Sequence, residues 1–517
     1  MTCADSESAF KHYGVPEGCS SISSMLAAVA RRRPDELAVS DGSRELTWRQ
    51  LDGAVSAFAA QIQGVRRLAV LSRDTIEMMV AMYGSARAHA VFCPIASAYT
   101  TSEVRRALEQ MGADAVFAPS PFSDRVTEAG FGPESLRRVT PDITATAPTV
   151  VLPGRDPKDI AWVISTSGST AAPKPVLIPE QSILLTGFAY AHAMNSGPTD
   201  KWLNFFPFFH TSGGWLTIHA LAAECSTRLM PNGFDAREGL EAITHGGVTH
   251  FGGFELFWKR MRALPEWETA DISGLTGVTI SGNLSLYDML EDLGVPQIFQ
   301  IYGSTETGLA SITSRHEDDR EARKYSNGHP TFGTEIRIVD PETGRDVPAG
   351  SPGEILTRGP FSAHGYMSGE DPEGIFDPEG WVHSGDHGWV DEAGRLYFRG
   401  RLKHVIKTGG ENVSSREVEI ALETLCENVL TAQVVGAPDP EWGEAVIAFV
   451  EIREETEFDA DEIKSVLRDH LAPYKIPKQF IRMGPADWPI TGNGKIHRPE
   501  LEPMAASARA EQLALVR

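Results

Sequence analysis

Apolar residues over roughly the first 320 positions follow two spacings, which predicts helices alternating with short strands. The segments RLAVLS (67–72) and DAVFAPS (114–120) are short β-rich runs, whereas DTIEMMVAMYGSARAHA (74–90) has apolar residues at helical spacing. This alternation predicts an α/β fold with largely parallel sheets. KDIAWVISTSGST (158–170) has the pattern of a strand that runs into a glycine-containing loop.

The pattern changes near residue 325, where Gly and Pro become frequent and short strands dominate. TEIRIVD (334–340), GEILTRG (353–359) and WVDEAGRLYFRGR (389–401) predict a small β-rich subdomain with hairpin turns over about residues 325–400.

Helices return after Arg401, with helical patterns at 414–425 and 459–471 and strand patterns at 431–437 and 445–452. At the start of the first of these helices, a serine followed three residues later by a glutamate matches a capping box. We therefore expect an N-terminal domain over 1–400 and a small α+β C-terminal domain over 401–517. The candidate capping residues are Ser414 or Ser415 with Glu417 or Glu419.

Composition narrows the kind of partner. A chain of 517 residues is too long for one core, and its formal net charge of -23 argues against nucleic acid or an anionic membrane. The five cysteines show no metal-ligand spacing, so we interpret them as small apolar residues of a reducing compartment. The N-terminus lacks a signal-peptide core and no apolar run is long enough to span a membrane, which predicts a soluble, cytoplasmic protein.

The stretch STSGSTAAPKPV (165–176) is a candidate phosphate loop. It offers hydroxyl groups, the small Gly168 and the cationic Lys174. It does not match the Walker pattern, because Lys174 lacks a preceding Gly and a following Ser or Thr. Read alone, it fits a polar turn after a strand equally well.

Seven further stretches, taken in order, resemble the adenylate-forming superfamily of acyl-CoA synthetases, luciferases and peptide-synthetase adenylation domains. The resemblance covers nearly the whole chain, and the ordered set is far more specific than any one motif. The stretches are FFPFFHTSGG (205–214), QIYGSTETG (300–308), GEILTRGPFSAHGYM (353–367), GWVHSGDHGWV (380–390), GRLKHVIKTGGENVSSREVE (400–419), VVGAPDPEWGEAVIAFV (434–450) and WPITGNGKIHRPEL (488–501).

The resemblance implies a large N-terminal domain of two α/β subdomains and a β-rich piece, followed by a mobile C-terminal lid. It implies two reaction steps, in which a carboxylate attacks the α-phosphate of ATP to form an acyl-adenylate and a thiol then expels AMP. The implied cofactors are ATP (or a supplied acyl-AMP), Mg²⁺ and coenzyme A. The lid sequence TGGEN (408–412) resembles the acyl-CoA synthetase branch, which favours free coenzyme A as the acceptor.

The resemblance also assigns nucleotide-site roles. Glu306 would hold Mg²⁺, a cation that prefers carboxylate oxygen, and Thr305 would contact the α-phosphate. Tyr302 would cover the adenine, while Asp386 and Arg401 would bind the ribose; a surface ion pair is the structural alternative for these two. The other expected nucleotide contacts are Thr166, Ser167, Gly168, Ser169, Thr170, Lys174 and Gly303.

Three further residues match catalytic or moving parts of the family. His210 matches the residue that gates the pantetheine tunnel, although a lone histidine among aromatic residues is more often a packed core residue. Lys403 matches the hinge of the lid, and Lys495 matches the lysine that stabilises charge during adenylation. The lid residues expected beside the pantetheine arm are Gly409, Gly410 and Glu411.

The chain departs from the family around the phosphates. Ala171 and Pro175 replace family glycines, where a β-carbon and a missing N–H disfavour close approach of an anion. Pro179-Glu180 replaces a Ser/Thr-His pair and adds a negative charge, and SGNLS (281–285) is unusual for the adenine-contacting stretch. These departures predict a weakened adenylation step.

The expected acyl pocket combines aromatic walls with glycines, which predicts a roomy apolar cavity for a bulky or aromatic acid. The alternative is that these aromatic residues are simply core. The expected pocket residues are Trp215, Phe251, Gly252, Phe254 and Gly282.

Three alternatives to a complete acyl-CoA ligase stay open at this point. One is a ligase that only transfers coenzyme A onto an acyl-AMP supplied by a partner adenylating enzyme. Another is a stand-alone adenylation protein that loads a carrier protein. The last is a non-catalytic binder of acyl-adenylate or AMP.

Overall fold

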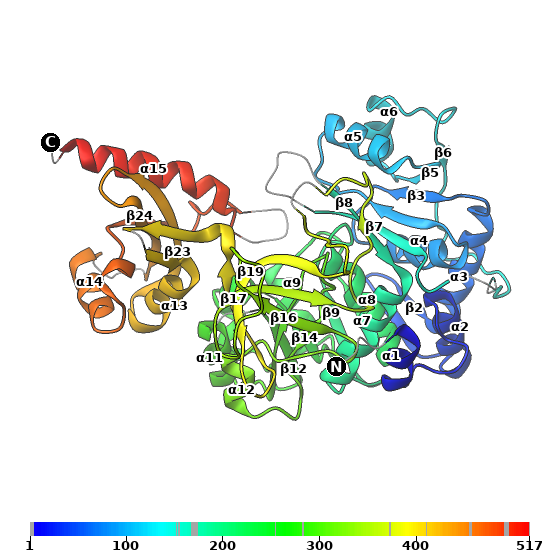
Figure 1. Cartoon of the computed structure of the whole chain (residues 1–517). Coiled ribbons are helices and arrows are strands. Elements are labelled where there is room, and N and C mark those ends of the chain that lie inside the picture. The colour runs from blue at the N-terminus through cyan, green and yellow to red at the C-terminus, as the bar shows by residue number, and fades with distance from the viewer. Residues whose placement is uncertain are drawn as a thin grey trace.

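The computed structural model describes residues 5–150, 152, 156–166, 174–253, 255–281, 284–371, 374–409, 411–453, 458–490 and 496–515. Four sheets carry the described strands, and two large ones build most of the N-terminal region (Figure 1). The mixed α/β architecture predicted from the sequence is confirmed.

The first large sheet has seven strands, and its centre is parallel as predicted. One edge is antiparallel, because β8 turns back on β7 and β18 pairs with β8. The candidate phosphate loop therefore joins two antiparallel strands instead of leading into a helix, which separates it from a Walker loop. In sheet order the strands are β18 (Gly365–Tyr366), β8 (Lys174–Pro179), β7 (Ile160–Thr166), β4 (Val91–Pro94), β3 (Arg67–Val70), β5 (Ala115–Phe117) and β6 (Arg137–Arg138).

The second large sheet has nine strands, parallel from β1 to β13 and closed by antiparallel pairs at both edges. The expectation of largely parallel sheets therefore holds for the centres of both sheets and is wrong at one edge of the first and both edges of the second. In sheet order the strands are β15 (His329–Pro330), β14 (Ile312–Thr313), β13 (Gln297–Tyr302), β12 (Gly277–Ile280), β11 (His250–Gly252), β9 (Lys201–Asn204), β10 (Ser226–Leu229), β1 (Leu37–Ser40) and β2 (Glu45–Thr47).

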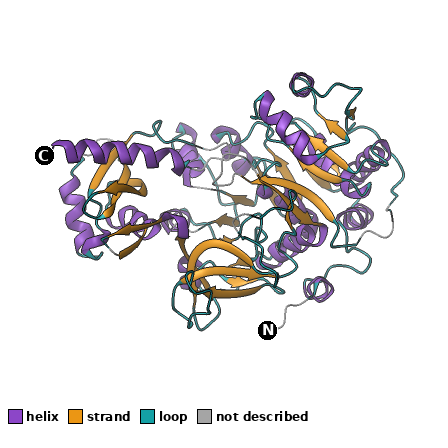
Figure 2. Cartoon of the chain, turned by 45° about the horizontal axis from the view of Figure 1, so that its top comes forward, coloured by secondary structure: helices purple, strands orange, loops and turns teal. Residues whose placement is uncertain are grey.

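Helices α7 (Glu180–Ala193) and α8 (Thr211–Ala223) lie between the two large sheets. Nearly every residue of both helices is buried, as expected for a helix that is covered on all sides. Their side chains join the core below the first sheet and a second core against the nine-stranded sheet. Figure 2 shows strands enclosed by helices throughout this region.

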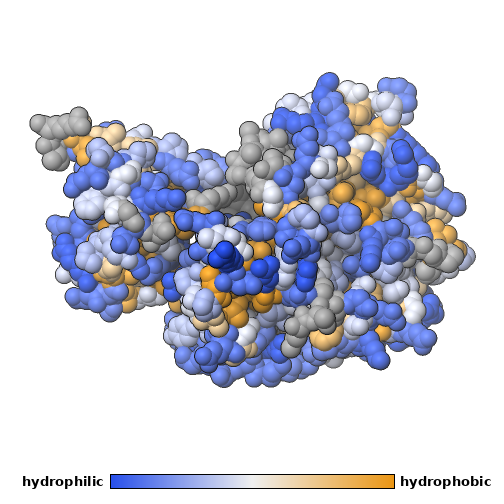
Figure 3. All heavy atoms as spheres, in the orientation of Figure 1, coloured by the Kyte–Doolittle hydropathy of each residue, from blue (hydrophilic) through white to orange (hydrophobic). Residues whose placement is uncertain are grey.

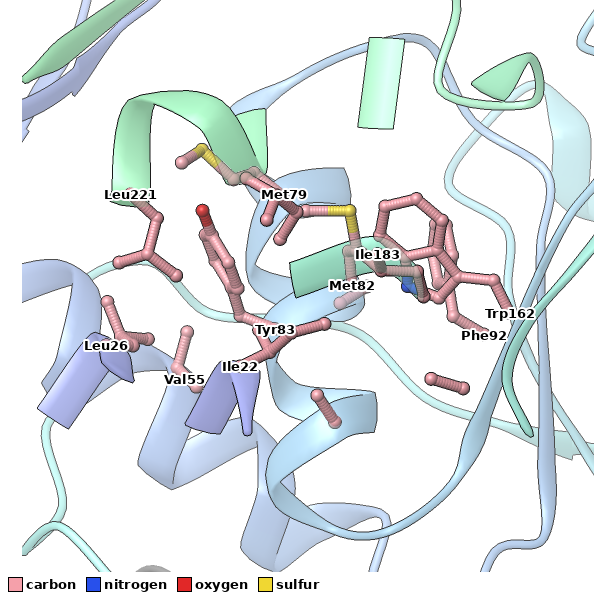
Figure 4. Close-up of a cluster of buried hydrophobic side chains, with 14 of the residues drawn as sticks. Ile22, Leu26, Val55, Met79, Met82, Tyr83, Phe92, Trp162, Ile183 and Leu221 are labelled. Carbon is pink, nitrogen blue, oxygen red and sulfur yellow. The ribbon is translucent and has the colours of Figure 1, made fainter. Parts of the chain in front are cut away.

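The other N-terminal helices cover the outer faces and the first core. Figure 4 shows that core, where Met79, Met82 and Tyr83 meet Trp162 and Ile183. The helices are α1 (Ser6–His12), α2 (Ile22–Arg32), α3 (Trp48–Gln61), α4 (Ile76–Arg87), α5 (Thr101–Met111), α6 (Phe122–Glu128), α9 (Ala236–Thr244), α10 (Glu255–Arg262), α11 (Leu284–Asp292) and α12 (Arg320–Tyr325), with a 3₁₀ turn η1 (Pro265–Thr269).

A small antiparallel sheet follows, in agreement with the predicted β-rich stretch. Its strands are β16 (Glu335–Val339), β17 (Gly353–Arg358), β19 (Val382–Val390) and β20 (Leu396–Arg401). In Figure 1 these strands lie between the N-terminal region and the C-terminal lobe.

The C-terminal lobe has its own five-stranded sheet and its own cores. The last strand of the small antiparallel sheet ends at Arg401 and the first strand of the lobe begins at Val405, close to the domain boundary expected from the sequence. The exact boundary and the rotation of the lid about Lys403 stay predictions. Ser414 caps α13, as one of the two predicted candidates. The elements are η2 (Leu402–His404), β21 (Val405–Thr408), β22 (Glu411–Ser414), α13 (Ser415–Leu425), β23 (Val429–Asp439), β24 (Gly443–Ile452), α14 (Ala460–Arg468), η3 (Pro473–Lys475), β25 (Gln479–Met483) and α15 (Arg498–Leu515).

Other composition-based expectations can be compared with the structure. Four cysteines lie in described segments and are buried free thiols. In the part of the chain that the structure describes, no helix combines the length and apolar character needed to cross a membrane. Hydrophilic residues cover most of the face in Figure 3, as the large net charge leads one to expect.

Candidate active site

The ends of β13 and β20 and the middle of β19 bring three of the predicted nucleotide residues together. The Tyr302 hydroxyl donates to Asp386 Oδ2 at 2.8 Å, and Arg401 Nε lies 2.8 Å from Asp386 Oδ1. Asp386 is 5% exposed, and the Arg401 guanidinium is the ionic partner of its buried Oδ1 among the described residues. A carboxylate oxygen accepts more than one hydrogen bond, so this arginine-paired carboxylate fits the predicted role of a ribose acceptor.

Burial raises the pKa of Asp386, and the neighbouring carboxylates Glu306 and Glu354 raise it further, while Arg401 opposes the rise. The site therefore holds concentrated negative charge. A polyanionic nucleotide would bind here only with cations that offset this charge, which is the role that the family assigns to Mg²⁺.

Glu354 and His383, which were not predicted as site residues, lie at the turn that carries Asp386. Glu354 Oε1 accepts from Gly385 N at 3.2 Å, and Glu354 Oε2 lies 3.2 Å from His383 Nδ1. Gly385 has φ +66°, a conformation that favours glycine. The GE and HSGD segments were recognised as motifs, but their cross-strand contact depends on the register of β17 and β19.

The segment after β13 forms a tight turn around Thr305 and Glu306. Ser304 N donates to Thr307 Oγ1 at 2.7 Å, and Glu306 N donates to Ser304 Oγ at 3.2 Å. A β-carbon at Gly303 would lie 2.2 Å from Gly308 O. Close backbone packing therefore already explains this glycine without a nucleotide contact.

Tyr366 connects the predicted magnesium ligand with the predicted phosphate-binding lysine. Its hydroxyl donates to Glu306 Oε1 at 3.3 Å, and Lys174 Nζ lies 5.4 Å from the centre of its ring. Strand β18 positions Tyr366 opposite Val176 of β8. The sequence marked Tyr366 only as part of a motif, because its pairing with β8 is long-range.

The phosphate-side departures have different structural settings. Pro175 lies in β8 opposite Ser165, and its carbonyl accepts from Met367 N at 2.9 Å. Thr166 Oγ1 donates to Lys174 O at 3.3 Å, which closes the described end of the hairpin. Ala171 lies outside the described residues, so its effect on an anion stays a prediction.

The added charge of Glu180 is buried at the start of α7. Glu180 is 1% exposed, and its Oε1 accepts from Ile22 N at 2.9 Å, at the start of α2. A carboxylate at a helix N-terminus interacts favourably with the helix dipole. Its position between the sheets explains this outcome, since the first turn of α7 is buried.

His210 is the N-cap of α8, with its Nδ1 accepting from Ser212 N at 3.3 Å. The next residue, Thr211, places its hydroxyl 3.5 Å from that of Thr305. The α8 N-terminus and the YGSTETG turn are therefore neighbours, as one active site requires.

The expected acyl-pocket residues divide into two groups. Trp215 and Phe251 are 2% and 0% exposed and belong to hydrophobic cores. At Gly252, a β-carbon would make only ordinary contacts, with Phe206 at 3.7 Å and Thr279 at 3.9 Å. The fold therefore does not require a glycine at position 252.

The lid residues of the TGGEN stretch lie in a hairpin. Gly409 follows β21 with φ +59°, and its N–H donates to Trp442 O at 2.8 Å. A β-carbon there would lie 2.9 Å from the Trp442 ring, and Glu411 is exposed at the start of β22. The backbone of Lys403 lies in η2.

Several predicted residues lie outside the described residues, and their roles stay predictions. They are Lys495, Ser167, Gly168, Ser169, Thr170, Phe254, Gly282 and Gly410.

Comparison with known proteins agrees with these features. Residues 26–367 match the AMP-binding enzyme family, and residues 417–495 match the C-terminal domain of AMP-binding enzymes. The chain belongs to the AMP-binding enzyme family, so its predicted membership of the adenylate-forming superfamily is confirmed. ATP, Mg²⁺ and coenzyme A, the cofactors predicted for this class, agree with this membership.

Individual relatives cover nearly the full length. A feruloyl-CoA synthase of Amycolatopsis sp is 29% identical, over 91% of this chain and 96% of the relative. An indoleacetate–CoA ligase of Aromatoleum aromaticum is 28% identical, over 94% and 98% respectively. The structure of o-succinylbenzoate CoA synthetase from Bacillus subtilis, in complex with its acyl-adenylate intermediate, aligns with a TM-score of 0.78 at 24% identity, over 92% and 97%. That alignment supports the fold.

Proposed function

We propose that this enzyme joins a bulky, hydrophobic or aromatic carboxylic acid to coenzyme A through an acyl-adenylate. The observation that carries the proposal is the meeting of three features: the buried Asp386 carboxylate bonded to Tyr302 at the end of β13, the Glu306 turn that follows β13, and the His210-capped helix α8, which contacts that turn through Thr211. The names of the relatives, which act on feruloyl and indoleacetate groups, support the aromatic class.

The residues divide the work as follows. Asp386 and Arg401 orient the ribose, and Glu306 would hold Mg²⁺, which offsets phosphate charge when it is bound. Thr305 supplies a hydroxyl toward the α-phosphate beside the N-terminus of α8. His210 stands at the start of that helix, where it separates the acid from the thiol that enters later.

The acid class is argued from a pair of adjacent glycines. At Gly253 a β-carbon would lie 3.0 Å from Phe257 and 3.2 Å from Phe251, so both rings would have to shift to admit one. At Gly252, in contrast, a β-carbon would make only ordinary contacts. The space in front of Gly252 is bounded by the half-buried Phe206 ring. Packing does not require a glycine at position 252, and an aromatic ring lies beside it. This combination is consistent with a pocket that binds a flat acyl group.

A second candidate function is a ligase that transfers coenzyme A onto acyl-AMP but adenylates poorly. The observation that favours it is the altered phosphate loop, with Ala171 and Pro175. In that case a partner adenylating enzyme supplies the acyl-AMP. Loading of a carrier protein is a further outcome of the same test.

The test measures thioester formation with coenzyme A, once from ATP with aromatic acids and once from synthetic acyl-AMP. Product from both supports the full ligase, and product from acyl-AMP alone supports the second candidate. Transfer to a carrier protein but not to coenzyme A contradicts both, as does binding of acyl-AMP without any product.

Gly252→Ala and Gly253→Ala then test the acid class as a matched pair. Gly252→Ala should keep its melting temperature and lose catalytic efficiency most strongly for the largest acids, whereas Gly253→Ala should mainly lose stability. Equal effects of Gly252→Ala on small and large acids would contradict the proposed pocket.

A further inference from the structure

Asp74 links the two α/β subdomains next to His210. It follows β3 of the seven-stranded sheet, and its Oδ1 accepts from Phe208 N at 2.8 Å. Phe208 follows β9 of the nine-stranded sheet and lies two residues before His210. The contact therefore crosses from one sheet to the loop that carries the candidate gate residue.

Asn204 holds the loop between β9 and α8 from within its own subdomain. Asn204 Nδ2 donates to Gly213 O at 2.9 Å, and Asn204 Oδ1 accepts from Phe206 N at 3.2 Å. His210 N closes a turn by donating to Pro207 O at 3.0 Å. The N–H of Phe208 lies inside this turn and uses the carboxylate of the other subdomain.

We propose that Asp74 is a positioning residue, which sets the turn before His210 and so fixes where the imidazole stands at the start of α8. The Phe208 side chain is 1% exposed and packs in the first core. The turn is therefore held both by the packing of this side chain and by the hydrogen bond of its N–H to Asp74. A shift of this turn would move His210 without changing any residue that touches a substrate. The inference rests on the proposed function, because it assigns the turn to the coenzyme A step.

The neighbouring Arg73 offers a matched control. Its guanidinium donates to Asn232 Oδ1, in the loop after β10, so it also crosses between the subdomains. That bond is made to the loop after β10 and not to the Phe208–His210 turn. Arg73→Ala therefore loosens the subdomain contact without releasing the Phe208 N–H.

The experiment compares Asp74→Ala, Asp74→Asn and Arg73→Ala for the coenzyme A step from synthetic acyl-AMP. We expect Asp74→Ala to lower kcat/KM for coenzyme A about tenfold, as for one lost hydrogen bond to a charged group. Asp74→Asn keeps an acceptor oxygen and should restore most of the rate. Arg73→Ala should stay within about twofold of the wild type, since its contact lies elsewhere.

Hydrogen–deuterium exchange of a peptide spanning 205–212 provides a readout that does not need activity. Asp74→Ala should accelerate its exchange, whereas Asp74→Asn and Arg73→Ala should not. The proposal is overturned if exchange of this peptide is unchanged in Asp74→Ala. It is also overturned if the coenzyme A step is as slow in Asp74→Asn or in Arg73→Ala as it is in Asp74→Ala. If the wild type makes no thioester while exchange follows the expected pattern, the proposed function fails and the positioning of the turn stands.

Discussion

At the residue scale, the site depends on carboxylates whose partners come from other parts of the chain. Asp386 is held by Tyr302 and Arg401, and Glu306 by Tyr366. Each pair joins residues at least 15 positions apart, so none follows from local sequence alone.

Asp386→Ala should weaken equilibrium binding of AMP about 10- to 100-fold, because a hydrogen bond to a charged group contributes roughly 1.5–3 kcal/mol. The matched control is Asp391→Ala, which breaks a carboxylate–arginine pair with Arg395 in the adjoining hairpin. Calorimetry with AMP measures both. An equal loss in the two variants would contradict a ribose role for Asp386.

The half-buried Asp74 predicts a pH dependence of stability. Burial raises the pKa of Asp74 to about 7, against about 3.9 for an unfolded chain. The folded state therefore binds this proton more tightly, so the stabilisation is complete below about pH 4 and is lost as the pH rises through about 7. Asp74→Asn lacks this titration, so the melting temperature of Asp74→Asn minus that of the wild type should increase as the pH rises from 4 to 8. A constant difference would contradict the shifted pKa.

At the element scale, the sequence predicted what local patterning determines. The helices at 74–90, 414–425 and 459–471 follow from apolar spacing and a capping serine, and the strands around 334–401 follow from alternation and turn residues. The antiparallel turn of β8 and the docking of β18 were missed, because two-residue and long-range pairings leave no periodic signal. The burial of Glu180 was missed for the same reason, since it depends on α2 packing against α7.

Pairing of β18 with β8 makes a specific prediction for Tyr366. Tyr366→Phe removes the bond to Glu306 but keeps the ring near Lys174, so the Mg²⁺ concentration for half-maximal adenylation should rise several-fold. Tyr366→Leu removes both contacts and should also raise the KM for ATP. Pyrophosphate exchange measures both quantities. An unchanged Mg²⁺ requirement in Tyr366→Phe would contradict the link to Glu306.

At the scale of the whole molecule, two large sheets and a small β-sheet build the N-terminal region, and a C-terminal lobe lies beside it (Figure 1). The lobe touches the N-terminal region where Lys259 Nζ donates to Leu430 O and Thr431 Oγ1, both at 2.8 Å. The ordered motifs predicted a large N-terminal and a small C-terminal domain because they cover nearly the whole chain. The acid itself was not predictable, since pocket shape depends on side chains from several strands.

The most direct test of an acyl-adenylate route follows the carboxylate oxygen. The enzyme is given ATP, coenzyme A and an aromatic acid labelled with ¹⁸O in its carboxylate, and the AMP is analysed by mass spectrometry. When the carboxylate attacks the α-phosphate, one carboxylate oxygen becomes bonded to phosphorus. That oxygen stays on AMP when the thiol attacks the acyl carbon and AMP leaves, so we predict AMP carrying one ¹⁸O per thioester formed. Unlabelled AMP, or ADP with labelled phosphate, would contradict the acyl-adenylate route.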